Sequence, residues 1–105
     1  MRKITEDDNG HALTLAVGDE VELSLAGNPS TGYQWELKAK GGPVCELVKD
    51  DFEAPTGAPG SGGVHRWQFR AVKPGSGKIA LQYRRSWEEK AAPARKYQVS
   101  VRVRT

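Results

Sequence analysis

The residues that could act as nucleophiles or bases are one cysteine, Cys45, and two histidines, His11 and His65. Cys45 lies in the apolar run 44–48, where a thiol is more often a buried core group than a nucleophile. Neither histidine has a Ser or Asp partner nearby in sequence that would indicate a triad, and we place His65 on the outward face of a strand beside Trp67. The Gly-x-Ser-x-Gly spacing of a nucleophile elbow is also absent. We therefore expect a protein that is not an enzyme, with no cofactor and no metal site.

Three long polar connections suit binding better than catalysis, and they span residues 26–32, 50–63 and 84–95. In the first of them, Asn28-Pro29 begins a tight turn and Gly32 ends it, because Pro presets one φ angle and Gly allows a positive one. Ser30 and Thr31 would then present two hydroxyl groups at the tip. The sequence indicates a rigid polar projection here.

The second and third connections contain different binding elements. Gly60, Gly62 and Gly63 would form an extended segment that another backbone can approach closely, although a plain linker is an alternative. Trp87 is surrounded by charged and polar residues, and an exposed Trp is a typical anchor of a protein interface. The alternative for Trp87 is a side chain folded back over the edge of the domain.

The elements that must position these connections are strands. The chain of 105 residues contains 12 Gly and 6 Pro, too many for a helix bundle, and one Cys, which excludes an intrachain disulfide. Apolar and polar residues alternate with period 2 in most segments, with turns expected at 17–19 and 73–77 and a short apolar strand at 44–48. The inward-facing residues would be Leu13 and Leu15; Val21, Leu23 and Leu25; Tyr33, Trp35 and Leu37; Trp67, Phe69 and Ala71; Ile79, Leu81 and Tyr83; and Tyr97, Val99, Val101 and Val103.

This pattern predicts an all-β chain, an antiparallel β-sandwich of about seven to eight strands, in a single domain over residues 1–105. If the strands follow one another in sequence order, the three long connections leave the sandwich at the same end. Three connections at one end would form a composite binding surface.

Charge is distributed unevenly. Residues 1–53 carry 5 Lys or Arg and 11 Asp or Glu, whereas residues 54–105 carry 11 and 2. Cross-strand pairing of opposite charges would explain this difference without a partner, and a nucleic-acid surface is the alternative. We expect pairing, and therefore no nucleic-acid partner. The basic residues concerned are Arg66, Arg70, Lys73, Lys78, Arg84, Arg85, Arg102 and Arg104.

No apolar run approaches the ~18 residues of a membrane span, so we expect no membrane partner. The N-terminus lacks the apolar stretch of a signal peptide, which predicts either a cytoplasmic protein or the mature form of a secreted or periplasmic one. Nothing in the sequence indicates an obligate oligomer, and we expect a monomer.

The three connections together resemble the chagasin family of inhibitors of papain-like cysteine peptidases. The family motif Asn-Pro-Thr-Thr-Gly-Phe/Tyr is matched by residues 28–33, Asn28 to Tyr33, with Ser30 for the first Thr. Gly-x-Gly-Gly is matched in full by residues 60–63, where Ser61 is the variable residue. Arg-Pro-Trp/Phe is matched by residues 85–87, Arg85 to Trp87, except that Ser86 replaces Pro.

The resemblance implies an immunoglobulin-like sandwich and reversible inhibition, in which these three loops enter the cleft of a papain-like cysteine peptidase. It implies that Ser30 and Thr31 cover the catalytic residues, that the loop 60–63 lies on one side and that Trp87 contacts the other. Residue chemistry alone leaves open a non-inhibitory β-sandwich adhesion or interaction module that uses the same loops.

Overall fold

The computed structural model describes residues 2–27, 33–53, 63–85 and 94–105, which form eight strands and one short 3₁₀ helix. The elements in chain order are β1 (Arg2–Ile4), η1 (Glu6–Asp8), β2 (Ala12–Ala16), β3 (Glu20–Gly27), β4 (Tyr33–Lys40), β5 (Cys45–Glu53), β6 (Gly63–Ala71), β7 (Gly75–Arg85) and β8 (Arg95–Arg104).

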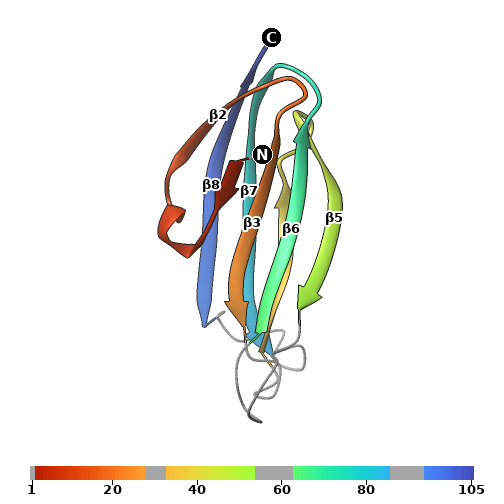
Figure 1. Ribbon diagram of the computed structural model, residues 1–105. Coiled ribbons are helices and arrows are strands. Elements are labelled where there is room, and N and C mark those ends of the chain that lie inside the picture. The colour runs from red at the N-terminus through yellow and green to blue at the C-terminus, as the bar shows by residue number, and fades with distance from the viewer. Residues whose placement is uncertain (1, 28–32, 54–62, 86–93) are drawn as a thin grey trace.

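The strands form two four-stranded sheets that face each other (Figure 1). Sheet A has the order β1-β3-β6-β5, and sheet B has the order β2-β8-β7-β4. The predicted β-sandwich is therefore confirmed. The pairs β1–β3 and β2–β8 are parallel, so the sandwich is not antiparallel throughout. Both parallel pairs involve edge strands of the N-terminal segment, which runs from sheet A to sheet B through η1.

The core lies between the sheets and consists of the alternating apolar residues. Trp67, Tyr97 and Phe69 are the largest fully buried side chains. Burying a side chain such as Phe69 contributes about 1.5–3 kcal/mol, so these positions hold the two sheets together. No helix in the described part of the chain is long and apolar enough to span a membrane.

The strand predicted over residues 44–48 is longer and less buried than expected. β5 extends to Glu53, and Val48 is 42% exposed. The pairing of β5 with β6 shifts register between Leu47 and Lys49, so Val48 sits at a β-bulge on an edge strand. A shift of one residue moves the following side chains from the core-facing to the outward-facing side of the strand. Simple alternation therefore did not predict which residues of this segment are buried.

The irregular connections are also shorter than predicted. Residues 50–53 belong to β5, Gly63 begins β6, and β7 and β8 take in residues 84–85 and 95. The turn predicted over 73–77 ends earlier, because β7 begins at Gly75. A Cβ atom on Gly77 would lie 2.6 Å from the carbonyl oxygen of Gly41, so this glycine permits close packing within a strand and is not a turn former.

One end of the sandwich, which we call the turn end, is closed by short connections that hydrogen-bond to neighbouring strands. The Gly18 N–H donates to the Ala71 carbonyl at 2.8 Å, and the Val72 N–H donates to the Val44 carbonyl at 2.8 Å. Val44 itself is fully buried and seals the core here. The turn predicted at 17–19 is confirmed within this network.

Candidate functional site

Six strand ends meet at the opposite end of the sandwich, which we call the loop end (Figure 1). They belong to β3, β4, β5, β6, β7 and β8. The three long connections join β3 to β4, β5 to β6 and β7 to β8. Register shows this directly, because Gly27 pairs with Gly63 and Tyr33 pairs with Arg85. The prediction that the three connections leave at one end is therefore confirmed.

Three of the predicted binding residues, Tyr33, Gly63 and Arg85, belong to the described chain. The other ten lie outside the described residues, and their predicted roles stay predictions; they are Asn28, Pro29, Ser30, Thr31, Gly32, Gly60, Ser61, Gly62, Ser86 and Trp87.

Tyr33 and Arg85 connect the base of the first loop to the base of the third. The Arg85 guanidinium carbon lies 4.6 Å from the centre of the Tyr33 ring, within the range of a cation–π contact. Tyr33 in turn stacks on Tyr83 with ring centres 5.2 Å apart and planes inclined by 20°. The stems of two loops are therefore held by a shared aromatic contact.

Trp35 extends this stack and joins the two sheets. Its ring centre lies 4.8 Å from that of Tyr83, and its Nε1 donates a hydrogen bond of 3.1 Å to the Ala26 carbonyl at the end of β3. β3 belongs to sheet A and β4 to sheet B, so this bond fixes the distance across the base of the first loop. A cavity of about 240 Å³ lies beside the stack, lined by Gly27, Tyr33, Gln34, Trp35, Phe52, His65 and Tyr83.

Gly63 is the glycine at which the second loop joins β6. It is buried, and a Cβ atom at this position would lie 2.5 Å from the Glu53 carbonyl oxygen and 2.7 Å from Cζ of Phe52. Real Cβ atoms essentially never approach backbone so closely. The last glycine of the Gly-x-Gly-Gly segment is therefore required by the close approach of β5 to β6 within this chain.

His65 does not lie on the outward face, contrary to the prediction. It pairs with Leu25 across the β3–β6 ladder, and its ring stacks on Trp67 with centres 3.9 Å apart. Residues 65 and 67 share a face because side chains in a strand alternate with period 2. The His65 Nε2 is also hydrogen-bonded to the Asp50 carboxylate on β5. His65 thereby ties the two stems of the second loop together.

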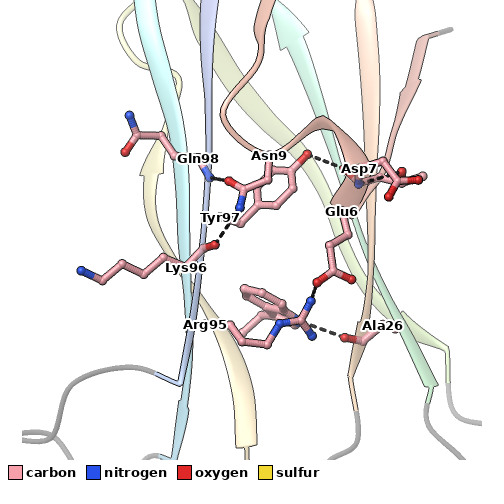
Figure 2. A network of polar contacts seen from close by, with 10 residues as sticks. Glu6, Asp7, Asn9, Ala26, Arg95, Lys96, Tyr97 and Gln98 are labelled. Atoms are coloured by element: carbon pink, nitrogen blue, oxygen red, sulfur yellow. Dashed lines mark hydrogen bonds and ion pairs between the residues drawn. The ribbon is translucent and has the colours of Figure 1, made fainter.

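The segment 5–9, which we call the N-terminal strap, supports β8 where it leaves the third loop (Figure 2). The Tyr97 hydroxyl donates to the Thr5 carbonyl at 2.7 Å, and the Gln98 N–H donates to Asn9 Oδ1 at 2.9 Å. Burial, with a smaller contribution from the charge of Asp8, raises the pKa of the Tyr97 hydroxyl, which therefore stays protonated and able to donate.

The strap also reaches the aromatic stack through an ion pair between Glu6 and Arg95 (Figure 2). The Arg95 guanidinium carbon lies 5.4 Å from the centre of the Trp35 ring. The sequence alone does not indicate Arg95 or Glu6, because they lie near opposite ends of the chain and neither belongs to a recognisable motif. Only the fold brings them together.

Cys45 is buried, with 6% of its surface exposed, as expected for a core thiol. Burial raises the pKa of this thiol, which keeps it protonated and therefore a poor nucleophile. Among the described residues, no group of three or more His, Cys, Asp and Glu side chains could hold a metal ion.

Comparison with known proteins identifies the class of this sandwich as a protein inhibitor of peptidases. Residues 14–101 match the family described as Chagasin family peptidase inhibitor I42. The chain is 40% identical to amoebiasin-1 of Entamoeba histolytica over 90 residues, which cover 84% of this chain and 86% of that protein. It is 31% identical to chagasin of Trypanosoma cruzi over 90 residues, covering 81% and 82%.

The fold agrees with these matches. The crystal structure of the cysteine protease inhibitor EhICP2 from Entamoeba histolytica superposes with a TM-score of 0.87 at 29% identity, covering 98% of this chain and 95% of that one. The chain therefore belongs to the chagasin family of peptidase inhibitors. This membership confirms the resemblance to the chagasin family and the expectation of an inhibitor in place of an enzyme.

Proposed function

We propose that this protein is a reversible inhibitor of papain-like cysteine peptidases and that residues 28–33, 60–63 and 85–87 enter the enzyme's active-site cleft. The single observation that carries the proposal is the meeting of all three loop stems at one end of a chagasin-family sandwich. The whole chain, residues 1–105, acts as one domain, and one copy binds one peptidase.

Inhibition without cleavage follows from what the first loop presents. A scissile carbonyl must come within about 3–3.5 Å of the nucleophile, in aligned geometry, before attack occurs. Ser30 and Thr31 would instead place hydroxyl groups and a methyl group over the catalytic Cys and His. The loop occupies the cleft, and the enzyme has no aligned carbonyl to attack.

The rigid stems lower the entropy that binding must remove. The contact of Arg85 with Tyr33, the bond from Trp35 to Ala26 and the exclusion of a side chain at Gly63 all fix where the loops begin. A binding surface that is ordered beforehand loses less entropy on association. Three loops together could bury about 800 Å² on each partner, which is enough for a tight complex.

Two departures from the family motifs predict weaker binding than in a member that has both family residues. Ser30 lacks one methyl group, which would contribute about 0.8 kcal/mol if buried. Ser86 replaces a Pro that would restrict the third loop. Neither change removes a hydroxyl group or the aromatic anchor, so we expect function to be retained.

The test is titration of papain with this protein and with Thr31→Ala and Trp87→Ala. We expect inhibition by the intact protein and weaker inhibition by both variants. Thr14→Ala is a matched control, because Thr14 is exposed on β2 and outside the proposed loops; it should inhibit as the intact protein does. Absence of inhibition by the intact protein at micromolar concentrations would refute the proposal.

Membership of an inhibitor family argues against the non-inhibitory adhesion module. That alternative predicts that the loops bind some other surface and that papain activity stays unchanged at every concentration of the protein. The same titration therefore separates the two functions.

A further inference from the structure

On the outer face of sheet A, the two arginines of β6 are neutralised by cross-strand pairing. Arg70 on β6 contacts Glu20 on β3 at 3.0 Å, and Arg66 on β6 contacts Glu22 on β3 at 3.4 Å. Arg66 also pairs with Glu53 on β5. β6 thus lies between two acidic strands, and the predicted pairing of charges is confirmed for Arg66 and Arg70.

On the outer face of sheet B, four of the basic residues lack such pairing within the described part of the chain, so the same prediction is wrong for them. Lys78, Lys96, Arg102 and Arg104 are all exposed on β7 and β8, and none forms an ion pair with a carboxylate within the described ranges. We call these four residues the basic face. The cause is the sheet order, because neither β2 nor β7, the neighbours of β8, contains an acidic residue.

Register places the basic face on one side of the sheet. Lys96 pairs with Gln82, and Arg102 pairs with Ser76 on one side and Thr14 on the other. Lys78 lies opposite Ser100, so it is a diagonal neighbour of Arg102, about 7–8 Å away between backbones. Four cationic side chains therefore point to solvent from two adjacent strands.

The carboxylate of β4 does not offset this charge. Glu36 lies opposite Gln82, and Nζ of Lys38 contacts Oε2 of Glu36 at 2.7 Å. The hydrogen bond from Lys38 lowers the pKa of Glu36, so the pair remains ionised and mutually neutralised. The charge of Arg84 on β7 also lowers the pKa of Glu36, and the four residues of the basic face are left without an ion-pair partner on β4.

The uncharged residues around the basic face restrict the kind of anion it suits. Single-stranded nucleic acid is held largely by base stacking on aromatic rings, and the outward positions of β7 and β8 carry none. A membrane-surface element needs large apolar side chains to insert, and the only apolar residue at the outward positions of the two strands is Ala80. The uncharged residues beside the cations are Gln82, Gln98, Ser76, Ser100 and Thr14.

We propose that the basic face binds a sulfated polysaccharide. Lys and Arg side chains would pair with sulfate and carboxylate groups, while the Gln, Ser and Thr side chains hydrogen-bond to sugar hydroxyl groups. A sheet suits an extended polymer, since side chains on one face repeat every ~7 Å along a strand. This binding function is separate from the proposed inhibition.

Three of the four residues of the basic face lie away from the loop end. Arg102 and Arg104 lie near the end of β8 that pairs with the start of β7, at the turn end, and Lys78 lies opposite Ser100. Lys96 lies at the other end of β8, opposite Gln82, and is exposed on the outer face of sheet B. A polymer held mainly by Lys78, Arg102 and Arg104 therefore covers the side of the sandwich, so the inhibitor can be retained on a polyanionic matrix and still engage a peptidase.

The experiment compares two pairs of lysine substitutions that change the net charge equally. Lys78→Gln with Lys96→Gln removes charge from the basic face, and Lys3→Gln with Lys49→Gln removes it from exposed positions of sheet A. Binding of a heparin oligosaccharide is measured over a range of salt concentrations. Each lost contact should lower the slope of log Kd against log salt by about 1, so the first pair should lower it by about 2.

The sheet A pair should leave that slope unchanged, and both double variants should inhibit papain and unfold like the intact protein. Equal weakening by the two pairs would overturn the proposal, because it would show attraction to net charge alone. Tighter binding of duplex DNA or anionic vesicles than of heparin would also overturn the assignment to polysaccharide. Failure of inhibition with heparin binding intact would refute only the proposed function.

Discussion

The two ends of the sandwich are built differently. At the turn end, short connections hydrogen-bond to neighbouring strands, and Val44 closes the core beneath them. At the loop end, the stems of three long connections are joined by stacked aromatic rings, by Arg85 on Tyr33 and by the close approach of β5 to Gly63.

From this difference we expect the turn end to contribute mainly to folding stability and the loop end mainly to binding of the peptidase. Turn-end contacts are backbone hydrogen bonds and buried apolar packing, which contribute to folding whether or not a partner is present. Loop-end contacts fix where the loops begin, and their effect should be largest when the loops are bound. Substitutions can therefore separate the melting temperature from the inhibition constant.

The largest effect on stability should come from Gly77→Val at the turn end. The new Cβ atom would lie 2.6 Å from the Gly41 carbonyl oxygen and 3.0 Å from Val44 Cγ2, so the strands must move apart. Overpacking of this kind costs about 1–3 kcal/mol. We expect a lower free energy of unfolding in urea and unchanged inhibition by the molecules that remain folded.

The control for this substitution is Ser76→Val, at the neighbouring exposed position of β7. It should change stability by less than about 0.5 kcal/mol. Equal destabilisation by the two variants would show that close packing at Gly77 is unimportant.

Gly63→Ala should affect both properties, because the glycine lies in the β5–β6 ladder at the stem of the second loop. The methyl group would meet the Glu53 carbonyl oxygen, forcing the two strands apart and displacing the loop. We expect a loss of about 1–3 kcal/mol in stability and a clear rise in the inhibition constant.

Gly27→Ala is the matched control for Gly63→Ala, since the two glycines pair across the ladder. A Cβ atom on Gly27 would approach no atom closer than 3.6 Å, an ordinary contact. It should leave stability almost unchanged. If Gly63→Ala is tolerated as well as Gly27→Ala, the close approach does not constrain the loop stem.

Arg95→Gln should weaken inhibition modestly. It removes the ion pair with Glu6 and the contact with the Trp35 ring, which tie the strap to the loop end. An exposed cation–π contact contributes about 0.5–1 kcal/mol, which corresponds to about a 2–5-fold change in the inhibition constant. Lys96→Gln, the adjacent outward position, should leave inhibition unchanged, and an equal loss from both would contradict the role of the strap.

Ser86→Pro should have an effect of about the same size as Arg95→Gln, with the opposite sign. A compatible Pro restricts the free chain and contributes about 0.4–1 kcal/mol. The inhibition constant should therefore fall by about 2–5-fold. An unchanged value would count against rigidity of the third loop as a source of affinity.

The fold could be predicted from the sequence because the core strands alternate strictly. Every second residue from Val21 to Leu25 and from Tyr97 to Val103 faces the core, as the period of 2 requires. Alternation did not predict which residues of β5 are buried, because the bulge at Val48 exchanges the core-facing and outward-facing sides of the strand. Alternation also did not predict β1 or η1, whose short segments carry too few apolar residues to show a period.

The loop end could be predicted in part. The motifs and the common end of the three connections were visible in the sequence, since sequential strands alternate in direction. The supporting contacts of Arg95, Glu6 and His65 were not, because they join residues far apart in the chain or depend on correct assignment of a face. The difference between the paired arginines of sheet A and the unpaired basic face of sheet B could be predicted only from the sheet order.

The most direct test of the central claim is the affinity of this protein for papain with its cleft free and with its cleft filled. A substrate-like inhibitor bonded covalently to the catalytic cysteine fills the cleft and leaves the rest of the enzyme surface unchanged. We predict tight binding to the free enzyme and loss of binding to the blocked one. Equal affinity for the two forms would contradict insertion of the loops into the active site.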